Sequence, residues 1–313
     1  MTARERYPID QSPLFRLNSR NRLAQRVFNV ELSWLESLAR QGDANFRVFD
    51  VVQGAKKRQV EIPKPILERL HRRIFTLLER IEKPDYLHSG VKGRSYITNA
   101  KVHVGLVPLV KLDLKKFYPS VSGALVYRFF CSQMQCSPDV AGLLTTLTTY
   151  DNHVPTGSCA SQLLAFFATK PMFDALDEIA IEHGVRGTVY VDDLTFSGRE
   201  ATPSYLWKIK QCVHAHGFAY HKERIYTCEQ LKLVTGVIID GNRIAVLPSK
   251  EFEIWRRQKA LEHGDLPSKA AAINSLIGSV VAAGQIEARL LKRLGRLRAA
   301  RAEVQLLQAA AMR

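Results

Sequence analysis

Two adjacent acidic residues, Asp192 and Asp193, constrain the possible folds of this chain more than any other sequence feature. They lie between the apolar segments 185–191 and 194–197, which predict a β-hairpin with both carboxylates at its tip. Adjacent carboxylates repel each other, and the repulsion raises their pKa values unless a cation lies close by. A solvated acidic turn is the simpler interpretation, so this segment alone does not establish a cation site.

Asp113 is a third acidic residue in a similar position, because it ends the apolar segment 109–112. Two such strands lying side by side would bring Asp113 next to Asp192 and Asp193. Carboxylate oxygens are the ligands that Mg²⁺ prefers. Two such ions about 4 Å apart activate a 3′-hydroxyl and stabilise a leaving pyrophosphate. The pattern therefore predicts two Mg²⁺ ions and nucleotidyl transfer.

The charge of the chain indicates a polyanionic partner. Its 45 Lys and Arg residues exceed its 30 Asp and Glu residues, which gives a net charge of +15. Nucleic acid is the usual partner of so basic a chain, although a basic surface also aids solubility. Residues 285–313 hold seven Lys or Arg and two acids, and predict a basic amphipathic helix.

Cysteine usage and hydropathy indicate the compartment. The five cysteines form no Cys-x-x-Cys pair, which argues against a disulfide framework or a structural zinc site and fits a reducing cytoplasm. No apolar run reaches the ~18 residues of a spanning helix. We therefore expect a soluble, cytoplasmic protein without a membrane partner.

Periodicity and turn residues predict the local structure. We expect helices over 13–40, 65–81 and 204–217, and from about residue 269 onward. A hairpin is expected over 46–62 with its turn at Gly54, and a strand over 233–239. A further helix is expected over 157–183, kinked or broken by Pro171.

Three segments in order resemble the catalytic motifs of reverse transcriptases: 112–120 (LDLKKFYPS), 154–162 (VPTGSCASQ) and 190–193 (YVDD). Two more match retron elements. Residues 99–103 (NAKVH) fit Asn-Ala-x-x-His, and residues 234–236 are the Val-Thr-Gly element. The chain thus resembles bacterial retron reverse transcriptases over roughly residues 12–300. It departs from the usual pattern at Lys116 and Val191, and at Thr156 and Cys159 in the second motif, where the family's template and nucleotide contacts lie.

The resemblance implies an α+β, right-hand polymerase fold. Its parts would be N-terminal helices and fingers in 1–98, a palm with an inserted fingers segment in 99–240, and a helical thumb with a basic C-terminus in 241–313. The palm would be an antiparallel sheet with packed helices.

The resemblance also implies roles for individual residues. Asp113, Asp192 and Asp193 would be catalytic, and would bind the metals together with Leu114. Nucleotide binding would involve Arg58, Lys57, Tyr118 and Gly157, with Tyr118 as a steric gate against ribonucleotides. RNA binding would involve Asn99, His103, Val234, Thr235 and Gly236.

Several of these residues also have a simpler, structural interpretation. The cluster containing Lys57 and Arg58 is usually a solvated basic face, and Tyr118 has the alternative of an ordinary buried aromatic. His103 is equally compatible with a structural position. The cation of the fourth polymerase motif is either Arg224 or Lys222.

By resemblance, the chain would be an RNA-directed DNA polymerase that uses dNTPs. Its template and primer would be a dedicated, structured non-coding RNA, from whose 2′-hydroxyl it would make branched RNA–DNA (msDNA). A separate effector protein and a role in antiphage defence are also implied. One alternative is another bacterial reverse transcriptase, intron-encoded or diversity-generating. A second is a non-catalytic RNA-binding protein with a polymerase fold.

Overall fold

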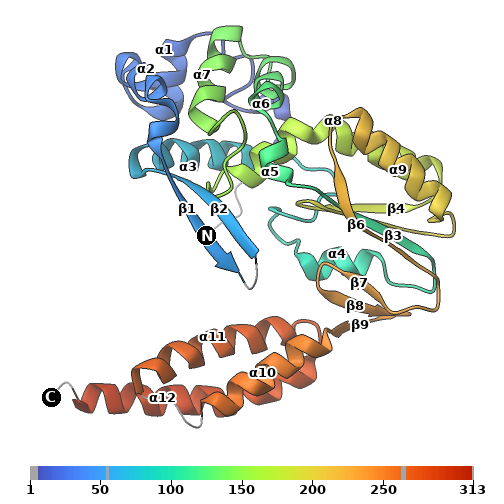
Figure 1. Ribbon diagram of the computed structural model, residues 1–313. Helices are drawn as coiled ribbons and strands as arrows, with labels where there is room; N and C mark the ends of the chain where they lie inside the picture. Colours follow the sequence, from blue (N-terminus) through green and yellow to red (C-terminus); the bar gives the residue numbers. More distant parts are fainter. Residues whose placement is uncertain (1–5, 54–55, 262–265, 312–313) are drawn as a thin grey trace.

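The computed structural model describes residues 6–53, 56–261 and 266–311. An N-terminal group of helices lies beside a central antiparallel sheet, and a smaller sheet connects that centre to the C-terminal helices (Figure 1). The β1–β2 hairpin projects between the N-terminal helices and the C-terminal helices. The described part of the chain is therefore of mixed helix and strand type, with antiparallel sheets.

The strands are β1 (Phe46–Gln53), β2 (Lys56–Pro63), β3 (Leu109–Leu114), β4 (Arg186–Tyr190), β5 (Asp193–Ser197), β6 (Tyr220–Tyr226), β7 (Lys232–Val234), β8 (Val237–Asp240) and β9 (Arg243–Val246). The α-helices are α1 (Arg20–Arg22), α2 (Leu32–Arg40), α3 (Pro65–Glu79), α4 (Tyr96–Val102), α5 (Phe117–Ser120), α6 (Gly123–Arg128), α7 (Pro138–Thr148), α8 (Ser161–Glu182), α9 (Pro203–Ala215), α10 (Pro248–Ala260), α11 (Leu266–Gly284) and α12 (Leu294–Ala311). Short 3-10 or π turns are η1 (Ile9–Gln11), η2 (Leu23–Phe28), η3 (Gly42–Asn45), η4 (Phe129–Gln133) and η5 (Ala288–Arg293).

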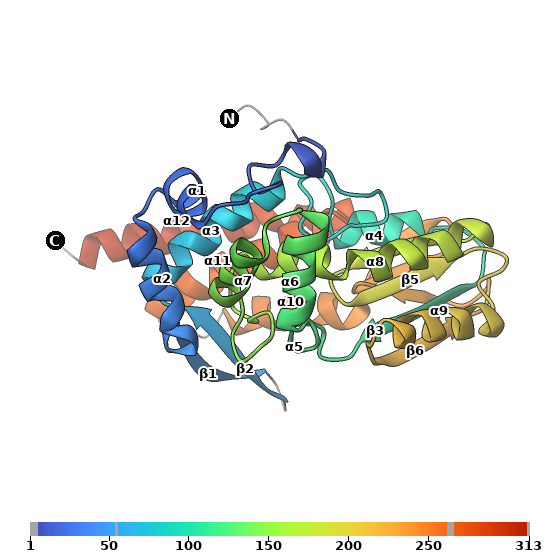
Figure 2. The same ribbon diagram turned by 90° about the horizontal axis from the view of Figure 1, so that it is seen from above.

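The central sheet has the strand order β4-β5-β3-β6, and all its pairs are antiparallel. Successive side chains of a strand point to opposite faces. One face carries Val110, Leu112, Leu194 and Phe196, which belong to the main hydrophobic core. Helices α8 and α9 cover this face (Figure 2), and Tyr205 of α9 packs edge-on against Phe196. The other face is polar and carries the candidate site.

The expected helix over 13–40 is interrupted, so this prediction was too simple. A π turn, η2, ends at Phe28, and Asn29 then adopts a left-handed conformation with φ of +56°. Asn tolerates that region better than most residues do, and it stops the helix. A new helix, α2, follows, with Leu35 and Leu38 buried. The apolar stripe correctly predicted the buried side of this segment, but it did not predict the interruption of the helix.

Pro171 lies inside α8, which begins at Ser161, and does not end the helix. Proline removes the hydrogen bond to the carbonyl four residues earlier. That carbonyl belongs to Phe167, and it accepts a hydrogen bond from Gln133 Nε2 at 3.1 Å. A side chain of the neighbouring η4 turn thus satisfies the freed oxygen. A break at Pro171 is therefore excluded.

The expected single strand over 233–239 is two strands, β7 and β8, joined by a tight turn. Thr235 and Gly236 both have positive φ, +46° and +82°. Two consecutive left-handed residues are typical of a two-residue hairpin turn. The other expected hairpins are confirmed at β1–β2 and β4–β5. Gly54, the expected turn residue of the first, lies outside the described residues.

The C-terminal helices α10, α11 and α12 pack around a separate apolar cluster that includes Ile254, Leu276, Val280 and Leu297. The expected helix over 285–313 begins later, at Leu294, after the 3-10 turn η5. Within the described ranges, no helix has both the length and the apolar character needed to cross a membrane.

Candidate active site

The polar face of the central sheet brings the three aspartates together. Asp113 is the penultimate residue of β3 and lies directly opposite Asp193, the first residue of β5. Asp192 occupies the β4–β5 turn, and its carbonyl accepts a hydrogen bond from the Leu114 backbone N–H at 2.7 Å. The expected side-by-side arrangement of the two strands is therefore confirmed. Leu114 contributes its backbone there, because its side chain is fully buried on the opposite face.

The β4–β5 turn is held in an unusual backbone conformation. Val191 has a φ of +58°, in the left-handed region that β-branched residues avoid. Its backbone N–H donates to Ser89 Oγ at 2.9 Å, and Ser89 is itself buried. Strain of this kind persists only where neighbouring contacts enforce it, and it gathers at functional sites. The contact with Ser89 thus fixes the direction of Asp192.

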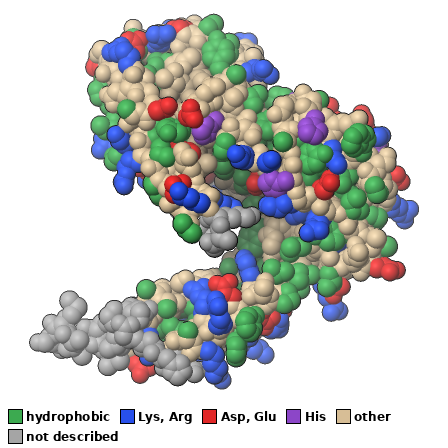
Figure 3. Space-filling view, in the orientation of Figure 1, with side chains coloured by type: hydrophobic (Ala, Val, Ile, Leu, Met, Phe, Trp, Pro, Cys, Tyr) green, Lys and Arg blue, Asp and Glu red, His purple; other side chains and the backbone are tan. Residues whose placement is uncertain are grey.

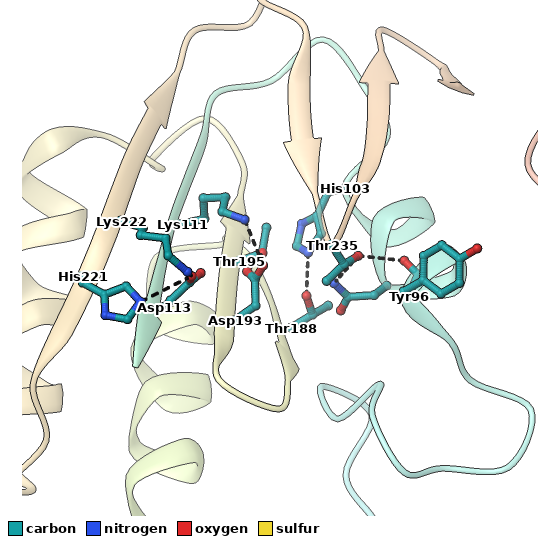
Figure 4. A network of polar contacts seen from close by, with 11 residues as sticks. Tyr96, His103, Lys111, Asp113, Thr188, Asp193, Thr195, His221, Lys222 and Thr235 are labelled. Carbon is teal, nitrogen blue, oxygen red and sulfur yellow. Dashed lines mark hydrogen bonds and ion pairs between the residues drawn. The ribbon is translucent and has the colours of Figure 1, made fainter. Parts of the chain in front are cut away.

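Lysines neutralise two of the three carboxylates (Figure 4). Lys222 Nζ lies 2.5 Å from Asp113 Oδ2, and His221 Nε2 lies 3.7 Å from the same oxygen. Lys111 Nζ lies 2.9 Å from Asp193 Oδ2, and the hydroxyl of Thr195 donates to Asp193 Oδ1 at 3.0 Å. Both oxygens of Asp193 are therefore engaged within the sheet.

The acidity of Asp192 reflects its surroundings. Burial raises its pKa, and the negative charges of Asp113 and Asp193 raise it further, against the opposing effects of a backbone hydrogen bond and, more weakly, of Lys222. The pKa shift shows that the three carboxylates lie within electrostatic reach of one another. A cation placed among them would favour the charged form of all three.

The residues present fit a divalent cation by their chemistry, since they offer hard carboxylate oxygens and a surplus of negative charge at Asp192. Among the described residues, however, no three His, Cys, Asp or Glu side chains converge closely enough to hold a metal ion. Instead, two of the carboxylates are paired with lysines of neighbouring strands, Asp113 with Lys222 and Asp193 with Lys111. Metal binding would require these two carboxylates to leave the lysines.

The structure distinguishes the two candidate cations of the fourth motif. Arg224 lies opposite Lys111 and is exposed. The register then shifts between Lys111 and Asp113, and Lys222 takes a φ of +54° within this irregularity. The shift directs Lys222 to Asp113, so Lys222 is the residue that reaches the aspartates.

Tyr118 lies close to the aspartates, in the short helix α5 that follows β3. Burial, together with the charge of Asp192, raises the pKa of its hydroxyl to about 12. Its ring lies 5.6 Å from that of Phe117 and packs against the main core. Tyr118 is thus partly packed and partly directed toward Asp192, an arrangement that fits either of its two expected roles.

Gly157 packs against the β1–β2 hairpin. Its backbone N–H donates to the Glu61 carbonyl at 3.0 Å. A Cβ at Gly157 would lie 2.7 Å from that carbonyl oxygen and 2.7 Å from Ile62 Cγ1. Close backbone approach therefore explains the glycine, while its expected nucleotide contact stays a prediction.

Glu61 joins the same loop to the hairpin by its side chain. The buried Glu61 carboxylate accepts hydrogen bonds from the Thr156 backbone N–H and from the Thr156 hydroxyl, both at 2.8 Å. Thr156 is one of the departures from the family pattern, and its pairing with Glu61 gives it a local function. A second anchor comes from α3, where His71 Nδ1 lies 2.6 Å from Ser158 Oγ.

Lys57 and Arg58 lie on β2, exposed to solvent. Lys57 Nζ forms an ion pair at 2.9 Å with Asp50 of the facing strand. Figure 3 shows a hollow on this side of the molecule, between its central part and the C-terminal helices, with Lys and Arg side chains around it. The nucleotide contacts expected of Lys57 and Arg58 stay predictions.

His103 lies at the other end of the same sheet face and has no exposed surface. Its Nδ1 is 2.7 Å from Ser197 Oγ, and its Nε2 is 2.7 Å from Thr188 Oγ1 (Figure 4). Burial lowers the pKa of His103 to about 3, so the ring is neutral. Of its two expected roles, the structural one fits, and direct contact with RNA is incompatible with this burial.

The two retron elements, far apart in sequence, meet in space. Asn99 is fully buried, and its Nδ2 lies 3.5 Å from Thr235 Oγ1, which donates to the Tyr96 carbonyl at 2.8 Å. Val234 is buried in the apolar cluster that joins α4 to β8. Asn99 and Val234 therefore have no surface to offer a ligand, which corrects their assignment as direct RNA contacts. Thr235 and Gly236 are partly exposed at the turn.

Three residues around the site were missed from sequence: Lys111, Glu61 and His71. Lys111 carries the one available signal, because a charge within an apolar strand two residues before Asp113 must point to the same face as that aspartate. Glu61 and His71 act on a loop about 90 residues later in the chain. No local pattern predicts such contacts.

The chain is similar in sequence to known reverse transcriptases of retrons. No protein-family model matches the chain. Curated sequences do match. The retron Se72 reverse transcriptase of Salmonella heidelberg is 31% identical over 196 residues, which are 60% of this chain and 51% of that protein. The retron Mx65 reverse transcriptase of Myxococcus xanthus is 30% identical over 207 residues, 58% of this chain and 48% of that protein.

A third relative extends the match along the chain. The retron Ec86 reverse transcriptase of Escherichia coli is 24% identical over 242 residues, covering 73% of this chain and 74% of that protein. By sequence, the chain is related to the reverse transcriptases of retrons. It spans about half the length of the Se72 and Mx65 relatives.

Proposed function

We propose that the chain is an RNA-directed DNA polymerase of retron type. The single observation that carries the proposal is the register of β3 and β5, which sets Asp113 opposite Asp193 with Asp192 in the adjoining turn. Its similarity to retron reverse transcriptases supports the same activity. In this proposal residues 1–98 include the fingers, 99–240 the palm and 241–313 the thumb.

The aspartates would hold two Mg²⁺ ions, with the Leu114 carbonyl as a further ligand. When bound, such ions activate the attacking 3′-hydroxyl and stabilise the leaving pyrophosphate. Lys222 is 2.5 Å from Asp113 and would be released as that carboxylate turns to the metal. Lys222 is then free to donate a proton to the leaving pyrophosphate.

Residues around the aspartates would select and hold the nucleotide. The ring of Tyr118, beside Asp192, would exclude a 2′-hydroxyl and so favour deoxyribonucleotides. Arg58, with Lys57, would contact the triphosphate, since arginine binds phosphate through paired hydrogen bonds. Gly157, tied to the hairpin through Glu61, would keep the loop after residue 153 close to the nucleotide.

The nucleic-acid partner would be a dedicated non-coding RNA, as in the retron systems that the chain resembles. The Thr235-Gly236 turn would contact it directly, while Asn99 and Val234 would support that turn from within and His103 would hold the sheet beneath through Thr188 and Ser197. The product would be DNA branched from a 2′-hydroxyl of this RNA. A separate effector protein and a role in antiphage defence would follow from such a system, in the cytoplasm.

The alternative is a non-catalytic RNA-binding protein with a polymerase fold. The test is primer extension by the purified chain on an RNA template with an annealed DNA primer, dNTPs and Mg²⁺. Extension supports the polymerase, and its absence with intact RNA binding supports the alternative.

A second experiment tests the partner. Nucleic acid that purifies with the chain from cells carrying its native locus is sequenced and treated with a debranching nuclease. One dominant RNA that releases a discrete DNA band supports the retron assignment. A heterogeneous pool of RNAs without branched DNA favours another kind of bacterial reverse transcriptase.

A further inference from the structure

A cavity of about 400 Å³ lies where the C-terminal helices meet the element formed by α4 and the β7–β8 turn. Tyr96, the first residue of α4, and Gly236, in the turn, form one wall. Helices α10 and α11 form the other, with Ile254 and Ala283 as part of its apolar surface. The volume lies within the range of small-ligand sites, which begins near 300 Å³.

The polar groups of this cavity are arranged around one arginine. Arg257 Nη2 donates to Ser275 Oγ at 2.6 Å, and Arg257 Nη1 donates to Ser279 Oγ at 3.1 Å. Lys250 adds a second positive charge to the lining, and Glu253, the acid among its residues, forms an ion pair with Arg257 (Oε1 to Nη1, 3.9 Å). The guanidinium is therefore held at the cavity by two hydroxyls and one carboxylate, and the lining keeps a net positive charge.

We propose that this cavity binds one unpaired nucleotide of the RNA partner. The proposal rests on the proposed RNA binding and extends it to a site that the polymerase chemistry does not use. A splayed-out base is usually stacked on an aromatic side chain and contacted at its polar edges. Tyr96 supplies the aromatic ring, Ser275 and Ser279 supply hydroxyls, and Arg257 with Lys250 complements a phosphate.

Charge favours a nucleotide over a protein side chain as the occupant. The chain carries a net charge of +15, and the helix that follows the cavity wall contains Arg296, Arg298 and Arg301. The hydroxyl of Thr235, the residue before Gly236, donates a hydrogen bond to the Tyr96 carbonyl. This bond links Tyr96 to the turn that contains Gly236, the two parts of this wall. RNA drawn to the basic helices would thus meet a preformed recess.

Gly278 allows the cavity to be filled without disturbing its walls. It lines the cavity, and a Cβ built there meets no atom within 4 Å. Gly278→Leu places a large side chain in the recess and also improves helix propensity within α11. Gly295→Leu is the matched control, because Gly295 is also an open helical glycine, on α12, and is not among the lining residues.

The first measurement is the binding of a fluorescein-labelled, ten-nucleotide single-stranded RNA of mixed sequence, followed by fluorescence anisotropy. In the second, the complex is irradiated with ultraviolet light, and mass spectrometry identifies the protein residues that are cross-linked to the RNA. Gly278→Leu is expected to weaken binding about tenfold, the effect of losing one stacked base, and to remove a cross-link at Tyr96. Gly295→Leu should bind like the wild type. Arg257→Met should weaken binding in the same direction.

Equal binding by the Gly278→Leu and Gly295→Leu variants would overturn the proposal. Cross-links that map only outside the cavity would overturn it as well. The same holds if Gly278→Leu binds RNA normally and instead loses a protein partner. Primer extension by the wild type on a pre-annealed template reports on the polymerase separately. A chain that fails to extend the primer and still binds RNA through the cavity would reject the polymerase and keep this inference.

Discussion

The two ends of one sheet face show how differently a family motif residue can act. At one end, Asp113, Asp192 and Asp193 are partly exposed, and burial with mutual repulsion raises the pKa of Asp192. At the other, His103 is completely buried, and both of its ring nitrogens have hydroxyl partners. The charged forms of the clustered aspartates are unfavourable without a nearby cation. The His103 ring, by contrast, has a hydrogen-bond partner at each nitrogen. We propose that motif residues of the first kind carry chemistry, whereas those of the second kind hold the framework.

The largest expected effect is at the carboxylate end. Asp192→Asn should reduce primer extension in Mg²⁺ by about a thousandfold or more, because losing a metal ligand removes several kcal/mol of transition-state stabilisation. The melting temperature should be nearly unchanged, since the change relieves repulsion between Asp192 and its neighbours. Asp240→Asn, at an exposed acid on β8, is the control. Near wild-type extension by the Asp192 variant would reject the metal site.

His103→Ala should show the opposite pattern at the buried end. It leaves a cavity and removes the partner of the Thr188 and Ser197 hydroxyls, at a cost of about 3 kcal/mol in the free energy of unfolding. Urea denaturation measures that cost, with the exposed His216→Ala as control. Primer extension per folded molecule should be retained. A stable variant with lost RNA binding would contradict the framework role.

Acid should destabilise the folded protein through its buried histidines. Burial lowers the pKa of His103 to about 3 and that of His71 to about 4, below the ordinary value of 6.5. Unfolded chains therefore bind protons that the folded protein does not, so stability falls as the pH drops from about 6.5 toward 4. Each histidine should cost about 2 kcal/mol by pH 5. Denaturation midpoints at pH 7 and 5 measure the loss, and His103→Gln should reduce it by about half, because His71 still contributes; an unchanged loss would contradict this account.

The smallest expected effect concerns sugar selection beside Asp192. Tyr118→Ala should raise incorporation of ribonucleotides relative to deoxyribonucleotides by on the order of tenfold, because the clash with the 2′-hydroxyl is removed. Competition between the two substrates on one primed template measures the ratio. Phe117→Leu is a control for packing, since Phe117 is buried beside Tyr118. Unchanged discrimination by an active Tyr118 variant would leave that ring a packing role only.

The elements around the aspartates were predictable from the sequence because their signals are local. Alternating and continuous apolar runs predict β3, β4 and β5, and the two-residue turn fixes the register of β4 with β5, which pairs Tyr190 with Asp193. Where local signals competed, the predictions failed. Asn29 interrupts the expected N-terminal helix, and the turn at Thr235 divides the expected strand.

The sequence by itself determined that each carboxylate lies at the end of an apolar strand, because strand formation and side-chain alternation follow from short-range patterns. The pairing of β3 with β5, which sets Asp113 opposite Asp193, joins segments far apart in the sequence and was decided by the tertiary structure. Only the tertiary structure decided which motif residues face solvent and which are buried, and that Lys222 rather than Arg224 reaches Asp113. It also joined Asn99 to Thr235 and Glu61 to Thr156 across long stretches of chain. Such contacts depend on how separate elements pack, and the free energy of packing is shared among residues that no local pattern connects.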